Sequence, residues 1–425
     1  MTTLGAGYGE SILTSPLGVE LMGYGFYLER RAESVLDDLK ARAVFLEKDG
    51  VRAVLVSCDL VGLTVEMSDA ARRGIAAALG LSMDHVLVAA THTHTGPATI
   101  EMPGLGEADP AYVPSLVPKI VAAAERAAAD AREARISYAQ EIIEPIGYNR
   151  RLKSFEEIDP VLRVVHLRRG SDRLMLLGYA CHAVVLGRGR AVSADWPGAA
   201  VRAVEEGGDR ALVLQGFCGD IDPVTNLNRW GAGTPEDLDL LGTIIARRAR
   251  KSEAYSVSFD DARIAARETR IRLPLVVPPA AAIEGEAAAF LEKNGAFPQA
   301  DRFARVWARA AAEARDRLAA SPFIENVPLQ VLDLAGPVLL GLPGEAFSAY
   351  RGFWTDTHPG LFPAGYANGD VGYFPTRAAF DDPGDYAAHG APKFYALFPF
   401  VPEIPSILAA AGRELLAGLV HGRTS

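Results

Sequence analysis

Two histidines stand two residues apart in a chain that is poor in histidine. His92 and His94 lie in residues 91–97 (THTHTGP), and the whole chain has only 8 histidines among 425 residues. This segment follows residues 85–90 (HVLVAA), an apolar run typical of a buried strand. Side chains two positions apart on a strand point to the same face, so both imidazoles are predicted to bind one metal ion. The alternative is a pair of hydrogen-bonded histidines at a strand end.

Two further residues at strand ends extend this predicted metal site. His182 ends the apolar residues 176–182 (LLGYACH), and Glu345 follows residues 338–344 (VLLGLPG). One edge of a sheet gathers residues that are distant in sequence. Imidazole nitrogen and carboxylate oxygen both bind Zn²⁺. The alternatives are a core histidine at position 182 and a glutamate that favours the start of a helix at position 345.

Competing catalytic signatures are missing from the chain. There is no G-x-S-x-G, no G-x-x-x-x-G-K-[ST], and no G-x-G-x-x-G that opens a helix after a strand. Cys181 adjoins His182, but neighbouring residues on a strand point to opposite faces, which argues against a Cys–His nucleophile. The three cysteines form no C-x-x-C pair and fit a reducing compartment. The motifs therefore favour chemistry at a metal.

The elements that position these residues alternate between strands and helices. Residues 41–47 and 51–58 flank Asp49-Gly50, which predicts a hairpin. Further strands are expected at 85–90, 136–143, 161–168, 173–180, 211–215 and within 329–342, and helices at 66–79, 112–134, 195–206, 234–252 and 404–420. Hairpins mixed with crossover helices predict an α/β fold of mixed β-sheets layered with flanking α-helices, with the metal site at strand ends.

Two segments depart from this alternation, and no domain boundary or internal repeat is evident. Residues 278–320 are dominated by Ala, Glu and Arg and broken at 295–298, which predicts a helical hairpin inserted into a single domain spanning residues 1–425. Residues 359–392 are rich in Gly, Pro, Asp and Tyr and predict a long ordered loop. Loops of that length in compact domains are usually functional.

Composition narrows the class of protein. The chain is 49% hydrophobic, which suits a large core, and its formal net charge is −10. No basic stretch interleaves with aromatic residues, so nucleic acid is not an expected partner. No run of about 18 apolar residues predicts a membrane span, and the N-terminus has no signal-peptide pattern. We expect a cytoplasmic protein, while the oligomeric state stays open.

The THTHTGP segment resembles the His-rich motif of the neutral/alkaline non-lysosomal ceramidase family. Further landmarks follow in the same order: 148–150 (YNR), 181–182 (CH), 193–198 (SADWPG), 215–220 (QGFCGD), 343–345 (PGE) and 368–376 (NGDVGYFPT). The resemblance implies a ceramidase-like catalytic domain that hydrolyses an amide with one Zn²⁺ per chain. The metal ligands that it implies are His92, His94, His182, Glu345 and Tyr373, and Tyr373 enters on the resemblance alone.

Other residues are assigned roles around that metal. Tyr373 and Arg150 are expected to stabilise an oxyanion, while Asp59, Asp195 and Asp220 are expected to orient the histidines. Asp222, in residues 219–223 (GDIDP), stands where the family has a serine. The family's long members also carry a C-terminal β-sandwich domain that this chain does not show.

The sequence therefore predicts a zinc-dependent hydrolase that cleaves the amide of a small N-acyl substrate through a metal-activated water. The alternatives are a non-catalytic, ligand-binding homologue that retains the metal pocket, and a zinc esterase or lactamase. A soluble or short-chain amide is expected in preference to long-chain ceramide. The pocket walls are expected from residues 359–392 and 278–320, with aromatic surface from Tyr366, Phe374, Phe380, Tyr386, Phe394 and Tyr395.

Overall fold

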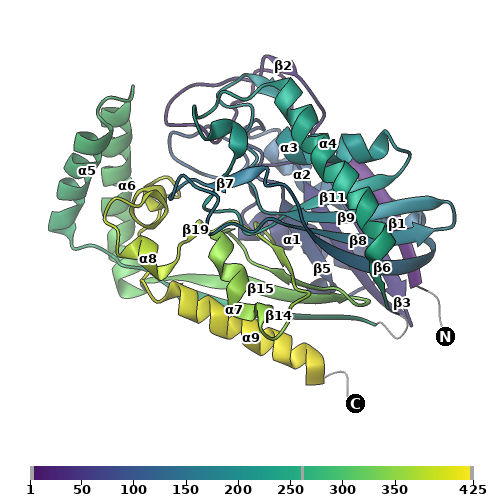
Figure 1. Ribbon diagram of the computed structural model, residues 1–425. Helices are drawn as coiled ribbons and strands as arrows, with labels where there is room; N and C mark the ends of the chain where they lie inside the picture. The colour runs from purple at the N-terminus through teal and green to yellow at the C-terminus, as the bar shows by residue number, and fades with distance from the viewer. Residues whose placement is uncertain (1–3, 260–262, 422–425) are drawn as a thin grey trace.

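The computed structural model describes residues 4–259 and 263–421, and it has the predicted α/β class. A nine-stranded mixed sheet and a four-stranded sheet face each other across a shared core, and helices cover their outer faces (Figure 1). Short two-stranded ladders lie near the site, in the loops that join these elements. The layered arrangement confirms the prediction of mixed sheets with flanking helices.

The large sheet has the strand order β11-β9-β8-β6-β1-β3-β4-β5, with β13 paired to β6. Neighbours are antiparallel except for the parallel pairs β4–β5 and β9–β11. Its strands are β1 (Leu4–Ile12), β3 (Lys40–Lys48), β4 (Val51–Cys58), β5 (Val86–Ala90), β6 (Arg132–Ile142), β8 (Val161–Arg169), β9 (Asp172–Tyr179), β11 (Arg210–Gln215) and β13 (Val257–Ser258).

The chain order of the large sheet repeats, although the sequence shows no repeat. The order β1-β3-β4-α1-β5-α2 is followed by β6-β8-β9-α3-β11-α4. In each half a helix crosses over between two parallel strands. The four helices are α1 (Val65–Leu79), α2 (Leu116–Ala129), α3 (Asp195–Glu205) and α4 (Pro235–Ser252). Because β6 is antiparallel to β1, corresponding strands of the two halves run in opposite directions.

Twist and curling of the sheet bring the ends of β5, β9 and β11 together. In a flat sheet of this order β5 would lie at the opposite edge from β11 and run opposite to β9 and β11. Neighbouring strands rotate by roughly 20–25°, so the strand direction turns by about 150° over the eight strands of the main path. The sheet also curls until its edges meet: the Ser57 hydroxyl of β4 donates to the Val213 carbonyl oxygen of β11 at 2.5 Å, and Thr93 and Ala183, just beyond β5 and β9, form a parallel bridge. The Gln215 amide at the end of β11 donates to the carbonyl oxygens of Thr91 at 3.0 Å and Cys181 at 2.7 Å.

The four-stranded sheet closes the core and carries the C-terminal part of the site. Its order is β14-β15-β16-β18, and α9 packs on β14 and β15. The bounds are β14 (Ile264–Pro274), β15 (Phe323–Leu334), β16 (Val338–Gly341), β18 (Phe362–Ala364) and α9 (Ile404–His421). The smaller elements are β2 (Ser34–Val35), β7 (Gly147–Asn149), β10 (Ala191–Val192), β12 (Ile221–Pro223), β17 (Glu345–Ala346), β19 (Tyr373–Phe374), α7 (Gly352–Thr355) and α8 (Arg377–Phe380).

Residues 278–320 contain two helices, α5 (Ala280–Asn294) and α6 (Ala300–Ala320), which stand out from the body at the left of Figure 1. They are attached by an aromatic cluster: Phe303 of α6 stacks on Phe26 at 5.2 Å between ring centroids and packs on Phe394 at 4.7 Å. The turn between the two helices therefore lies against loops that come from both ends of the chain.

Two sequence-based boundaries were wrong. The helix predicted over 112–134 ends at Ala129, and β6 begins at Arg132. The turn between them is held by Asp130, whose carboxylate accepts a hydrogen bond from the backbone N–H of Tyr8 at 3.0 Å. The segment 359–392 is more regular than the predicted loop, because β18, β19 and α8 lie in it. In both cases a long-range contact defines the local structure.

Helix α2 lies directly against strand β1, and Gly9 makes this contact possible. A Cβ at Gly9 would lie 2.3 Å from the Ala123 carbonyl oxygen, whereas a Cβ at Gly5 would meet nothing closer than 3.6 Å. We expect Gly9→Ala to lower the free energy of unfolding by about 1–3 kcal/mol through overpacking. Gly5→Ala, on the same strand, should change it by less than about 0.5 kcal/mol. Urea denaturation measures both, and equal effects would contradict this packing.

Candidate metal centre

The three predicted histidines meet at one point. One ring nitrogen from each of His92, His94 and His182 lies within 4.8 Å of the others. His92 and His182 are buried and His94 is half-buried. The Nε2 atoms of His92 and His94 are 2.9 Å apart. The structure therefore gathers three nitrogen donors from two strand ends, as the sequence predicted.

The other ring nitrogen of each histidine faces a backbone carbonyl, and this settles which atoms can bind a cation. The Nδ1 atoms lie 2.5, 2.8 and 2.7 Å from the carbonyl oxygens of Val61, Gly23 and Cys218, respectively. A carbonyl only accepts, so each Nδ1 carries a proton and, in a neutral ring, each Nε2 presents a lone pair. With both rings neutral, the Nε2 lone pairs of His92 and His94, 2.9 Å apart, repel each other, and a metal ion bound by both would relieve the repulsion. The cluster therefore fits a metal ion.

Glu345 adds an oxygen donor to the three nitrogens. Its Oε2 lies 3.0 Å from His182 Nε2 and 3.3 Å from His92 Nε2. Two tyrosines orient the carboxylate: Tyr395 donates to Oε1 at 2.6 Å and Tyr366 donates to Oε2 at 3.3 Å. Neutral imidazoles with one carboxylate are a donor set that suits Zn²⁺ and related divalent metals.

The histidines converge by a different route from the one that the strand rule predicts. Strand β5 ends at Ala90, and His92 has a left-handed backbone with φ of 61°. A non-glycine residue in that region is strained and tends to mark a functional site. The backbone N–H of His92 donates to Leu60 O at 2.9 Å, and that of His94 donates to Ala183 O at 3.1 Å. Contacts to two other segments, not strand periodicity, aim the two rings.

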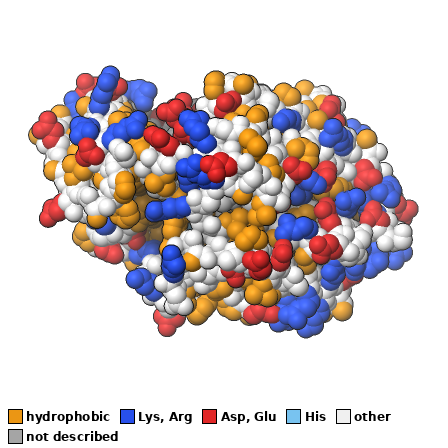
Figure 2. Space-filling model, turned by 90° about the horizontal axis from the view of Figure 1, so that it is seen from above, with side chains coloured by type: hydrophobic (Ala, Val, Ile, Leu, Met, Phe, Trp, Pro, Cys, Tyr) orange, Lys and Arg blue, Asp and Glu red, His pale blue; other side chains and the backbone are white. Residues whose placement is uncertain are grey.

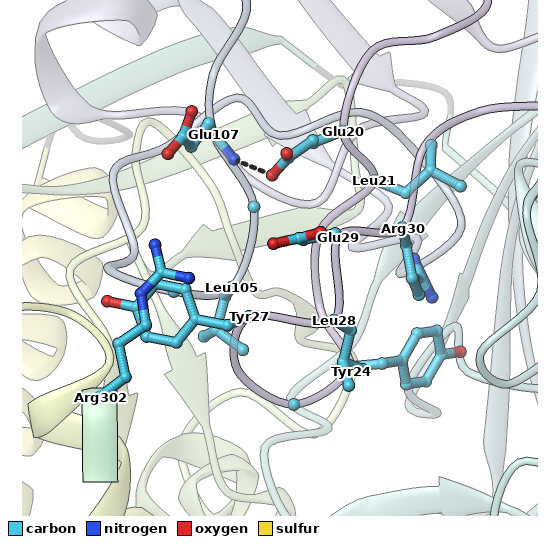
Figure 3. Close-up of a pocket in the computed structure, with 13 residues that line it drawn as sticks. Glu20, Leu21, Tyr24, Tyr27, Leu28, Glu29, Arg30, Leu105, Glu107 and Arg302 are labelled. Carbon is cyan, nitrogen blue, oxygen red and sulfur yellow. Dashed lines mark hydrogen bonds between the residues drawn. The ribbon is translucent and has the colours of Figure 1, made fainter. Parts of the chain in front are cut away.

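His94 is supported from behind by Arg30 and Tyr24. The Arg30 guanidinium donates to the His94 carbonyl oxygen at 2.9 Å and lies 4.6 Å from the centre of the Tyr24 ring. The Tyr24 ring in turn packs edge-on against His94, with 5.4 Å between centroids. Figure 3 shows Tyr24 and Arg30 in the wall of a small neighbouring pocket of about 70 Å³. No histidine lines that pocket. Arg30 and Tyr24 therefore lie between it and the candidate metal centre and contact His94 from the pocket side.

The protonation states around the centre suit a cation. Burial and the neighbouring imidazoles lower the pKa of His94 well below its usual value, and burial lowers the pKa of His182. Burial works against ionisation of Glu345, but the histidines outweigh it and lower its pKa. Burial also disfavours charge on His92, where the Glu345 carboxylate nevertheless raises the pKa. Glu345 is therefore ionised beside neutral His94 and His182.

Tyr373 and Arg150 lie together beside Glu345. Strands β17 and β19 pair in parallel, which puts Tyr373 directly opposite Glu345 in the ladder. The Arg150 guanidinium donates to the Tyr373 hydroxyl oxygen at 2.9 Å and to the Gly219 carbonyl oxygen at 2.7 Å. Burial raises the pKa of Tyr373, so its hydroxyl keeps its proton. Because Arg150 donates to the Tyr373 hydroxyl oxygen, the Tyr373 O–H remains available to donate a hydrogen bond.

Asp222, at the position where the resemblance implies a serine, pairs with the same arginine. Its Oδ1 lies 3.3 Å from Arg150 NH1, and its Oδ2 accepts from Trp230 Nε1 at 3.1 Å. The buried Asp222 carboxylate therefore neutralises part of the Arg150 charge. In this chain Asp222 acts on the arginine, and it makes no contact with the histidines.

The expectation that Asp59, Asp195 and Asp220 orient the histidines was wrong. Backbone carbonyls accept from all three Nδ1 atoms, and the aspartates have other partners. Asp59 pairs with Arg42 at 2.5 Å. Asp195 accepts from the backbone N–H groups of residues 185, 186 and 196, and Asp220 accepts from Asn149 and Ser348. Asp195 and Asp220 thereby hold the loops next to His182 and Glu345.

Two tyrosines and an aspartate at the centre were not predicted as site residues. Tyr395 bridges two carboxylates, since its hydroxyl lies 2.6 Å from Glu345 Oε1 and 3.2 Å from Asp370 Oδ2. Burial, with the Glu345 charge, raises the pKa of Asp370 to about 7. Tyr366 stacks on the His92 ring at 4.1 Å. The aromatic content of residues 366–395 was the available signal, but it indicated pocket surface and not contacts to the ligand carboxylate.

Cys181, the alternative nucleophile, does not point into the centre. Its Sγ lies 4.0 Å from the Ile146 carbonyl oxygen in the core. Burial raises the pKa of its thiol well above the usual value. A protonated thiol is a poor nucleophile. The geometry therefore agrees with the sequence argument against a Cys–His pair.

The candidate metal centre faces a pocket of about 290 Å³. His92, His94, Glu345 and Tyr373 line this pocket, and its remaining wall is mostly apolar. That wall includes Phe26, Leu28, Met102, Leu105, Phe297 and Phe394. Seen from above in Figure 2, the surface is hollowed between the lobe at the left and the rest of the molecule, with hydrophobic side chains in the hollow.

The predicted pocket walls are only partly the observed ones. Of the six expected aromatic residues, Tyr386, Phe394 and Tyr395 line this pocket, together with Phe297 and Pro298 from the turn between α5 and α6. Phe374 is fully buried elsewhere in the core. The pocket walls thus come from both predicted segments and, unexpectedly, from residues 23–28 near the N-terminus.

The structure is that of an α/β protein in which two helix-covered sheets share a core and three histidines meet at the strand ends. Among solved structures, neutral ceramidase from Pseudomonas aeruginosa is similar, with a TM-score of 0.74 and 19% identity over 99% of this chain and 75% of that chain. A ceramidase complexed with C2 matches with a TM-score of 0.75 and 19% identity over 99% of this chain and 76% of that one. No family model and no curated protein sequence matches the chain.

The chain therefore has the fold of neutral ceramidase, and the resemblance inferred from the motifs is confirmed at the level of fold. In the described part of the chain, no helix combines the length and apolar character that crossing a membrane requires.

Proposed function

We propose that this protein belongs to the neutral ceramidase family and is a zinc-dependent hydrolase of N-acyl amides. The observation that carries the proposal is the set of three Nε2 atoms turned toward one another, each with its Nδ1 bound to a carbonyl. Ceramidases of the same fold support the amide as the scissile bond. The residues that would hold zinc are His92, His94, His182 and Glu345.

Bound zinc would supply a Lewis acid and a water whose pKa is lowered to about 7. The chain's own residues would do the rest. Tyr366 and Tyr395 hold the Glu345 carboxylate in place. The Tyr373 O–H, with Arg150 behind it, would donate to the carbonyl oxygen as negative charge develops there. The apolar wall would take the acyl group and keep bulk water away from the amide.

Metal removal tests this proposal directly. We expect the purified protein to contain about one zinc per chain, and a panel of short-chain N-acyl amides to be hydrolysed. A chelator should abolish hydrolysis and lower the melting temperature, because the converging lone pairs lose their cation, and added zinc should restore both. Elemental analysis, calorimetry and product release measure the three quantities. Protein that stays metal-free in excess zinc, or full activity without metal, would contradict the proposal.

A further inference from the structure

Arg188 lies in the wall of the histidine-lined pocket without an acidic partner among the described residues. It lines the pocket together with His92, His94 and Glu345, and it is exposed. Across residues 4–259 and 263–421 its guanidinium makes no hydrogen bond or ion pair. The centre of the Trp230 ring lies 5.9 Å from its guanidinium carbon. An arginine presents five N–H donors in a rigid fork, so a free one in a pocket is suited to bind an anion.

The turn that carries Arg188 is held in position. The Asp195 carboxylate accepts from the backbone N–H of Val185 at 3.1 Å and of Leu186 at 3.2 Å. Gly187 has a φ of 65°, and a Cβ there would lie 2.3 Å from the Gly231 carbonyl oxygen. On the other side of Arg188, the Arg190 carbonyl oxygen accepts from the backbone N–H of Glu33 at 2.9 Å. The guanidinium therefore projects from a defined position at the mouth of the pocket.

Arg188 also marks the boundary with a second pocket. This second pocket, lined by both charged and apolar side chains, has a volume of about 660 Å³ and shares Tyr386 with the histidine-lined pocket. Trp230, which lies next to Arg188, lines the second pocket and donates to Asp222, which pairs with Arg150. A continuous row of contacts thus runs from the Tyr373–Arg150 pair to Arg188. A substrate with its amide at Tyr373 and its acyl group in the apolar pocket would extend its amine side along this row.

The charges that line the second pocket balance one another. Two pairs cancel, Arg150 with Asp222 and Arg151 with Asp385. Lys153 and Asp382 also line the pocket, and their opposite charges balance although they form no ion pair with each other in the described chain. Arg188, which lines the neighbouring pocket, therefore adds a positive charge that no residue of the second pocket balances.

We propose that Arg188 binds a carboxylate on the amine side of the substrate, so that the preferred substrates are N-acyl amino acids. The inference rests on the proposed amide hydrolase function and names its substrate class. Arginine and carboxylate form two parallel charge-assisted hydrogen bonds, which give strength and orientation. Water cleaves the C–N bond: the acyl carbon gains oxygen, the nitrogen gains a proton, and the products are a fatty acid and an amino acid.

Paired substrates test the inference. N-octanoylglycine and N-octanoylethanolamine share the acyl chain and differ in the group at the end of the amine side. We expect wild-type kcat/KM to be at least about 10-fold higher for the glycine amide, since a hydrogen bond to a charged group discriminates by that order. Arg188→Gln should lower this ratio at least about 10-fold, and Arg188→Lys less. Arg190→Gln is the control, because Arg190 pairs with Glu33 and does not line either pocket.

Binding separates failure of this inference from failure of the proposed function. N-octanoylglycine should bind metal-free wild-type protein more tightly than metal-free Arg188→Gln, as measured by isothermal titration calorimetry. If no amide is hydrolysed but this difference is found, the hydrolase proposal fails and the carboxylate site stands. A wild-type preference for the neutral amide, or an unchanged ratio and equal binding in Arg188→Gln, would overturn the inference.

Discussion

His182→Gln is expected to empty the metal centre. The zinc content should fall from about one per chain to below about 0.1, because one of three converging nitrogen donors is removed. Hydrolysis should fall at least about 10³-fold, since Lewis-acid stabilisation of the transition state is worth several kcal/mol and each 1.36 kcal/mol is tenfold in rate. Elemental analysis of the purified variant and its initial rate measure the two effects. Glutamine is close to histidine in size, which limits the cavity left at this fully buried position.

The matched control is His166→Gln. His166 is also buried, in the middle of β8, but its ring pairs with Ser252 Oγ at 3.0 Å and takes no part in the cluster. This variant should keep its zinc and its activity per folded protein, even if the loss of a core contact lowers its stability. A full zinc content in His182→Gln would remove His182 from the metal site. Equal metal loss in both variants would trace the effect to folding.

Tyr373→Phe is expected to separate metal binding from catalysis. The hydroxyl keeps its proton and its oxygen accepts from Arg150, while three histidines and Glu345 supply the other donors, so the zinc content should stay near one per chain. Removing one hydrogen-bond donor to a developing oxyanion costs about 10²–10³ in kcat. The effect should appear in kcat more than in KM, because the interaction strengthens as charge develops. Steady-state kinetics with a short-chain amide, together with elemental analysis, test both parts.

Tyr179→Phe is a suitable comparison for that variant. Tyr179 is as buried as Tyr373, but its hydroxyl accepts from the backbone N–H of Ile146 at 3.4 Å, in the core beneath α3. Its loss should leave kcat unchanged. If Tyr373→Phe instead loses its zinc, Tyr373 acts as a metal ligand, as the family resemblance implies. If it keeps both zinc and full kcat, Tyr373 has no role in the reaction.

Local signals in the sequence predicted much of the fold. The hairpin of β3 and β4 formed as expected, because Asp49 and Gly50 both adopt the positive φ values that a tight turn needs, 53° and 77°. Helix α4 begins where Thr234 and Asp237 form a capping box. By contrast, β14 (Ile264–Pro274) carries four charged residues among its eleven and has no apolar run, so hydrophobic periodicity does not reveal it.

The residue types of the metal centre were likewise readable in the sequence, because histidine is rare here and donor chemistry is a property of the side chain itself. His92, His94, His182 and Glu345 were identified from motifs at the ends of apolar runs. Their partners were not. Tyr395 approaches Glu345 across 50 positions, and Asp222 approaches Arg150 across 72. A window of sequence contains no information on which distant side chain will fill a neighbouring position.

The meeting of the histidines was decided by tertiary structure alone. In the strand order of the large sheet, β5 and β9 point in opposite directions, and the twist and curl of all the strands between them bring their ends together. The left-handed backbone of His92 and the carbonyls that face each Nδ1 then aim the rings. Donor identity is a local property of a residue, whereas convergence is a sum of small rotations over the whole sheet, and that sum exists only once the sheet has formed.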